Sequence, residues 1–165
     1  MAGTTRKLNR GWLVLLLAAL LAGCGAQPTA TGKDTQAVTI DGRRFDLELA
    51  LTPPARYQGL SGREQIPPEG GMLFVFPQAR ERHFVMRDCL VPIDLIFLDP
   101  NGRVVRMHQM EVEPPDTPEA ALERYHSRYP AQFAIELKGG TLDELTLHRG
   151  DQLDLPRKVL KDRAR

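Results

Sequence analysis

Residues 70–105, GGMLFVFPQARERHFVMRDCLVPIDLIFLDPNGRVV, hold the densest apolar and β-branched runs of the chain outside its N-terminus. Three runs within them, at 72–76, 83–86 and 93–98, have the length and composition of short strands. Prolines, a charged run and the Pro100-Asn101-Gly102 turn separate the three. The pattern predicts a chain that folds back on itself repeatedly and contains polar residues among apolar ones, above all Arg87, Asp88 and Asp94.

The sequence before this stretch predicts a hairpin followed by a short helix. Apolar and polar residues alternate at 37–40 and at 45–51, on either side of an Asp41-Gly42 turn. Thr52 stands where a helix N-cap is expected, because Pro53 and Pro54 follow it and Gly59 comes near the end of the helix.

The sequence after it predicts three more strands, at 103–110, 133–137 and 152–155, with a helix at 120–129 and a short helical turn at 142–147. Many short strands with frequent turns favour a mainly β fold. We therefore expect one compact domain, either a β-sandwich of jelly-roll-like form or a barrel, with two or three short helices.

The N-terminus has the features of an export signal. Arg6, Lys7 and Arg10 precede an apolar run at 12–21, which is too short to span a bilayer comfortably. The sequence Leu-Ala-Gly-Cys, which ends at Cys24, resembles a bacterial lipobox, in which the cysteine receives diacylglycerol and fatty-acyl chains such as palmitate. We expect a signal peptide at 1–23, a flexible tether at 24–36, a β-domain at 37–156 and a basic tail at 157–165.

The expected location is the cell envelope, where the lipid on Cys24 would hold the protein on a membrane. Gly25 stands where an inner-membrane retention signal would have Asp, so we expect the outer membrane, with the domain facing the periplasm. Without the three basic residues of the leader, 19 basic residues stand against 21 acidic ones. This balance gives no reason to expect nucleic-acid binding, which needs a net positive surface.

Several motifs together resemble those of the family known as domain of unknown function 192. They are RYQGLSGR at 56–63, GMLFVF at 71–76, FVMRDCLVPID at 84–94, IELKGG at 135–140 and the Gly150-Asp151 pair. They occur in the order of the family over about residues 45–155. The resemblance implies a compact, mostly β, sandwich-like fold, and it implies no reaction, substrate or cofactor.

Cysteine chemistry and metal binding are weak hypotheses here. Once Cys24 carries lipid, Cys89 has no partner for a disulfide. Cys89 with His83 could form a thiol nucleophile and base, but the family signature usually has Thr at the position of Cys89. His83, Met86 and Cys89 are soft copper ligands, yet residues three apart on a strand point to opposite faces. We expect no metal and no cofactor.

The candidate site residues are Arg56, Arg63, Asp88 and Asp94. The two arginines and Asp94 could orient a polar ligand such as a glycan or a peptide at one rim of the domain. Asp88 could also take part, or it could only stabilise a turn. Asp94 could equally accept backbone hydrogen bonds or pair with an arginine. Asp88 and Asp94 flank Pro92 and could form the catalytic carboxylate pair of a hydrolase.

The sequence therefore leaves three functions open. The preferred one is a non-enzymatic binding or accessory module of the envelope. The alternatives are a hydrolase that uses Asp88 and Asp94, and a purely structural envelope protein.

Overall fold

The computed structural model of the protein describes residues 1–3 and 34–165. The expected leader from residue 4 onward, Cys24 and the tether as far as residue 33 lie outside the described residues.

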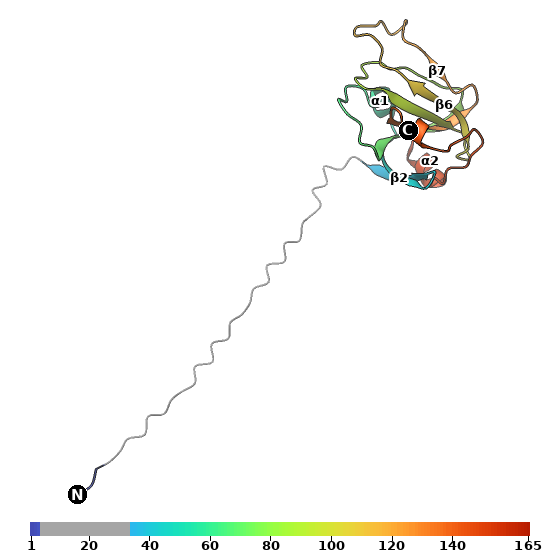
Figure 1. Ribbon diagram of the computed structural model, residues 1–165. Helices are drawn as coiled ribbons and strands as arrows, with labels where there is room; N and C mark the ends of the chain where they lie inside the picture. Colours follow the sequence, from blue (N-terminus) through green and yellow to red (C-terminus); the bar gives the residue numbers. More distant parts are fainter. Residues whose placement is uncertain (4–33) are drawn as a thin grey trace.

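Six strands form one open, mixed sheet in the order β1-β2-β3-β8-β5-β6, and two very short strands form a second sheet, β4-β7 (Figure 1). All neighbouring strands run antiparallel except β2 and β3. The strands are β1 Thr35–Ile40, β2 Arg43–Ala50, β3 Gly70–Arg80, β4 His83–Phe84, β5 Ile93–Leu98, β6 Val104–Met110, β7 Tyr125–His126 and β8 Ala131–Lys138.

The helical segments are short and lie outside the sheet. They are α1 Pro53–Gln58, the single 3-10 turn η1 Leu142–Glu144 and α2 Arg157–Arg163. The expectation of a single mainly β domain with two or three short helices is confirmed. The barrel alternative is wrong, because β1 and β6 end the large sheet without pairing with each other.

The predicted hairpin and first helix follow from local chemistry. Asp41 and Gly42 both have positive φ, 47° and 75°, as the tight turn between β1 and β2 requires. Thr52 caps α1, since its hydroxyl accepts a hydrogen bond from the Ala55 N–H at 3.4 Å.

The hydrophobic core is divided into two by the large sheet. The central strands β3, β5 and β8 carry buried apolar residues on both faces. One face packs against the C-terminal segment through Leu153, Leu155 and Leu160. The other packs against the residues after α1 and the small sheet, which contribute Leu60, Met86 and Tyr125. Because both faces are covered, the central strands are continuously apolar rather than alternating.

Gly71 allows the closest approach within the sheet. A Cβ atom at this position would overlap the carbonyl oxygen of Glu136 on the neighbouring β8, and the residue has a φ of 150°. Glycine is therefore required where β3 begins between β2 and β8.

The prediction of a helix at 120–129 is wrong. The segment contains turns and bends and then the short strand β7, which pairs with β4. Just before this segment, the Thr117 hydroxyl donates a hydrogen bond to the Pro114 carbonyl at 2.6 Å. Leu122 and Tyr125 are buried, so tertiary packing outweighs the local helical signal here.

The C-terminal residues differ from the expected last strand and basic tail. The 152–155 segment makes only an isolated bridge, from Gln152 to Arg103. Residues 157–163 form α2, whose Leu160 is fully buried in the core. The basic composition of this segment favoured a solvated tail, because Leu160 is the only apolar residue of the helix that faces the core.

This packing predicts a large effect of a single substitution in α2. Leu160→Ala should lower the free energy of unfolding by about 2–5 kcal/mol, because it leaves a cavity under the helix. Chemical denaturation of the two proteins measures the difference. Val159→Ala is the matched control, since Val159 is 58% exposed and its truncation should cost little. Equal, small losses for both variants would show that residues 157–163 do not pack on the core.

Candidate functional site

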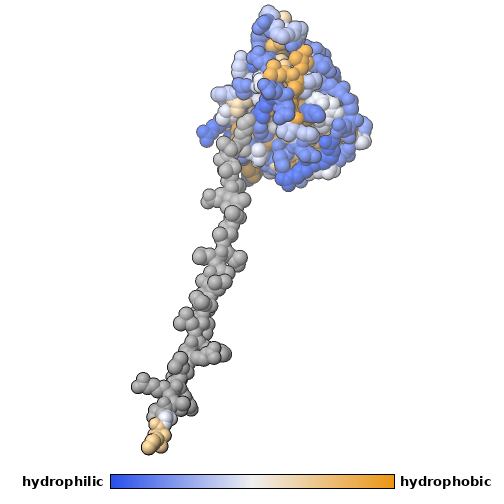
Figure 2. All heavy atoms as spheres, turned by 60° about the vertical axis from the view of Figure 1, so that its left-hand side comes forward, coloured by the Kyte–Doolittle hydropathy of each residue, from blue (hydrophilic) through white to orange (hydrophobic). Residues whose placement is uncertain are grey.

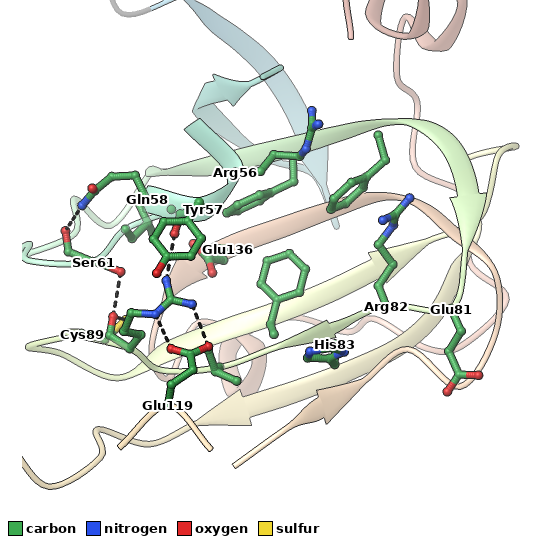
Figure 3. A pocket seen from close by; sticks show the side chains of 17 residues that line it. Arg56, Tyr57, Gln58, Ser61, Glu81, Arg82, His83, Cys89, Glu119 and Glu136 are labelled. Atoms are coloured by element: carbon green, nitrogen blue, oxygen red, sulfur yellow. Dashed lines mark hydrogen bonds and ion pairs between the residues drawn. The ribbon is translucent and has the colours of Figure 1, made fainter. Parts of the chain in front are cut away.

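A pocket of about 300 Å³ opens on the face of the sheet that carries α1 (Figure 3). Its walls come from α1 and the turn after it, from β3, from the residues around β4 and from β8. The apolar part of the wall is aromatic. Phe84 packs edge-on against Phe74 at 4.9 Å and against Phe97 at 5.4 Å between ring centroids.

Glu136 lies at the base of this pocket, in the middle of β8. The side chain is only 5% exposed. The Leu60 N–H donates to its carboxyl group, but within the described part of the chain its Oε2 has no hydrogen-bond partner. Burial raises the pKa of Glu136 to about 8, so this carboxyl is mainly protonated at neutral pH.

Arg63 lies near Glu136 without neutralising it. Its guanidinium donates two hydrogen bonds to the Glu48 carboxylate, at 2.7 and 2.6 Å. This bidentate pair raises the pKa of Arg63. The positive charge lowers the pKa of Glu136 somewhat, but burial has the larger effect.

Two more arginines, Arg56 and Arg82, lie beside the Phe76 ring at the pocket. The Arg82 guanidinium carbon lies 3.7 Å from the ring centroid, and that of Arg56 lies 5.3 Å from it. Arg82 donates to the carbonyls of Gln78 and Ala131, at 2.6 and 3.4 Å. Burial, with the charges of Arg56 and Arg80, lowers the pKa of Arg82 to about 10. Among the described residues no acid forms an ion pair with Arg82.

A third arginine, Arg87, forms part of the rim. Its guanidinium lies 4.0 Å from the centroid of the Tyr57 ring and donates to both carboxylate oxygens of Glu119, at 2.6 and 3.0 Å. The hydrogen bond from Arg87 lowers the pKa of Glu119. This pair ties the 111–124 segment to the edge of the pocket (Figure 3).

Cys89 also lines the pocket, but its chemistry is not that of a nucleophile. Burial raises the pKa of the thiol to about 11, so at neutral pH it is not the reactive thiolate. The nearby Ser61 hydroxyl donates to the Arg87 carbonyl at 2.7 Å. Within the described part of the chain, no three His, Cys, Asp or Glu residues are placed to hold a metal ion.

The structure does not bring the four candidate site residues together. Of the four, only Arg56 lines the pocket, and its guanidinium donates to main-chain oxygens of Leu51, Val75 and Arg165 at 2.8, 3.0 and 2.7 Å. Arg63 is occupied by Glu48. Asp88 is exposed, in a turn where its φ is 52°.

Asp94 lies on the opposite face of the sheet from Glu136. The register pairs Asp94 with Leu137 and Leu95 with Glu136, and successive side chains of a strand point to opposite faces. Asp94 accepts a hydrogen bond from the Leu142 N–H at 2.6 Å. This agrees with the alternative in which Asp94 accepts backbone hydrogen bonds. Burial raises its pKa. Asp88 and Asp94 share no pocket.

Sequence reasoning missed Glu136, Arg82 and Arg87 as site residues. Glu136 closely precedes Gly139 and Gly140, and an acid in such a position is more often a turn or cap residue than a site residue. The available signal was a single acid inside the apolar run AQFAIEL at 131–137, since a buried carboxyl without a partner is costly and needs an explanation.

Comparison with known proteins decides the family. The sequence model of domain of unknown function 192, described as uncharacterized ACR, matches residues 36–155. The chain belongs to this family. Among curated proteins, none matches the chain significantly.

Two solved structures resemble the protein. One, from Sinorhizobium meliloti, is described as a candidate transcription regulator. It is 34% identical with a TM-score of 0.59, over 73% of this chain and 90% of that one. The other, a protein of unknown function from Novosphingobium aromaticivorans, is 22% identical with a TM-score of 0.63, over 77% of this chain and 89% of that one. The second likeness concerns the fold alone.

The buried Glu136 predicts how stability depends on pH. In the unfolded chain the carboxyl ionises near its ordinary pKa of 4.5, whereas in the folded protein its pKa is about 8. Between these values unfolding releases a proton, so Glu136 makes the free energy of unfolding fall as pH rises through this window and level off above it. Glu136→Gln removes the titration.

Urea denaturation of both proteins, at several pH values between about 5 and 9, measures this effect. The wild-type protein should lose stability relative to Glu136→Gln as pH rises. A difference that does not change with pH would show that Glu136 is not protonated in the folded state.

Proposed function

We propose that the protein is a lipid-anchored binding module of the cell envelope, and that it takes a small polar ligand, such as a glycan or peptide fragment, into the pocket above Glu136. The observation that carries this proposal is the unpaired Oε2 of Glu136 at the base of an open pocket. Burying a carboxyl oxygen without a hydrogen-bond partner costs free energy in the free protein, and a ligand that supplies the missing hydrogen bond would remove this cost.

The lining of the pocket supports binding by its composition. Aromatic rings provide apolar area, and a few polar groups converge on the same space, which is the usual make-up of a small-molecule site. The face of the domain drawn in Figure 2 is mostly hydrophilic, with apolar residues exposed in a limited area.

The geometry gives less support to hydrolysis by Asp88 and Asp94. Such an enzyme needs both carboxyl groups in one cleft, about 5–10 Å apart, whereas these two line no common pocket. A purely structural role needs no pocket, and it leaves unexplained why Oε2 of Glu136 has no hydrogen-bond partner among the described residues.

The anchor is part of the proposal because the lipobox-like sequence ends at Cys24. None of the described helices is long and apolar enough to cross a membrane. We infer attachment through lipid on Cys24, at the outer membrane and facing the periplasm.

The anchor can be tested by fractionation. Cys24→Ala should move the protein from the membrane fraction to the soluble fraction of the envelope, because the lipid attachment site is lost. Cys89→Ala is the matched control and should stay with the membrane. Recovery of Cys24→Ala in the membrane fraction, in the same amount as wild type, would contradict the anchor.

Binding can be tested with soluble fragments released from peptidoglycan by a muramidase. Immobilised full-length protein should retain a subset of these fragments, as mass spectrometry of the eluate would show. Val85→Trp should abolish retention, because Val85 lines the pocket and the larger side chain would fill it. Arg44→Gln is the control, since Arg44 is 70% exposed and lies outside the pocket.

Two results would count against the proposal. Retention by Val85→Trp at the wild-type level would place binding outside the pocket. No retention by the wild-type protein would favour a structural role over the binding of envelope fragments.

A further inference from the structure

We propose that the ligand carries a carboxylate, which Arg82 holds at one end of the pocket, and a hydrogen-bond acceptor, to which the carboxylic acid of Glu136 donates at the other end. This inference rests on the proposed function and names the chemical class of its ligand. Figure 3 shows the two side chains entering the pocket from different elements, Glu136 from β8 and Arg82 from the segment between β3 and β4.

Arg82 provides a positive charge that has no acidic ion-pair partner among residues 34–165. Its guanidinium lies over the Phe76 ring, partly out of water, and its two hydrogen bonds go to neutral carbonyls. Arg56, on the same ring, adds to the positive potential. Guanidinium groups match the planar fork of a carboxylate, and a partly buried one gains more from an anion than one in water.

Glu136 provides a hydrogen-bond donor rather than a second negative charge. The Leu60 N–H already donates to this carboxyl, so a proton on the partnerless Oε2 points to an acceptor supplied by the ligand. While Glu136 is protonated, it does not repel an anion. Once ionised, it would repel a carboxylate and attract an amine instead.

The other titratable groups around Glu136 leave this arrangement intact. Arg63, the nearest positive charge, is held by Glu48. Cys89 stays a neutral thiol. At the rim, Glu119 is paired with Arg87, and Glu81 lies 3.9 Å from the His126 ring. His83 packs against His126, with 5.6 Å between the ring centroids.

The remaining wall fits an apolar face attached to the carboxylate. Phe74, Phe76 and Phe84 present ring surface between the two polar ends. Both a sugar ring and an aromatic side chain can pack on such rings. An acidic sugar and the terminal carboxylate of a peptide therefore share the required chemistry, and matched probes distinguish them.

The experiment is calorimetric titration of full-length protein with two matched pairs of compounds. N-acetylmuramic acid is compared with N-acetylglucosamine, which lacks the carboxylate, and N-acetylphenylalanine is compared with its amide. In at least one pair the acid should bind about tenfold or more tightly than its neutral partner. The pair that shows this preference identifies the source of the carboxylate.

Three variants assign the effect to its residues. Arg82→Gln should remove the preference for the acid, whereas Arg44→Gln removes the same charge at the surface and should keep it. Between pH 6.5 and 9 the affinity of wild type for the acid should fall, because Glu136 loses its proton about midway. Glu136→Gln should bind the acid with little change over this range.

The outcomes separate this inference from the proposed function. Equal binding of acid and neutral partner, or a preference that survives Arg82→Gln, would overturn the carboxylate inference while leaving a binding pocket. If none of the four compounds binds, the inference also falls, and the retention of peptidoglycan fragments still decides the binding function by itself.

Discussion

The structure depends on the burial of β8 in the centre of the large sheet. This strand has neighbours on both sides and is covered on both faces, so each buried side chain on it must be apolar or must find a polar partner. Glu136 fulfils that condition only in part. Its protonated form is a consequence of putting one carboxyl in such a strand, and the pocket opens above it.

Much of the fold could be predicted because its signals are local. Several elements can be predicted from a few adjacent residues: the hairpin from the turn at Asp41-Gly42, α1 from the cap at Thr52, and β5 from its apolar run. The errors arose where distant residues decide the outcome. The 120–129 segment contains the short strand β7 because β4 pairs with it, and α2 exists because its Leu160 fits the core beneath it.

The site could be predicted far less well, because it is made of residues brought together by the sheet. Asp94 was singled out as an acid beside an apolar strand, and it lies on the face away from the pocket. Glu136 had the same local description and points into the pocket. Only the register of β5 against β8 distinguishes the two, and no spacing along the chain gives that register. Arg82 lies in a charged run and could not be distinguished from its exposed neighbours.

The single parallel pair in the sheet has a consequence for how this family can vary. Parallel neighbours cannot be joined by a tight turn, so the chain must cross over one face between β2 and β3. In this protein the crossover, residues 51–69, carries α1 and the glycine-containing turn that forms one wall above Glu136. Insertions or deletions in the crossover would reshape the cavity while the strand pairing stays as it is. Different members could thus have differently shaped cavities on one unchanged scaffold.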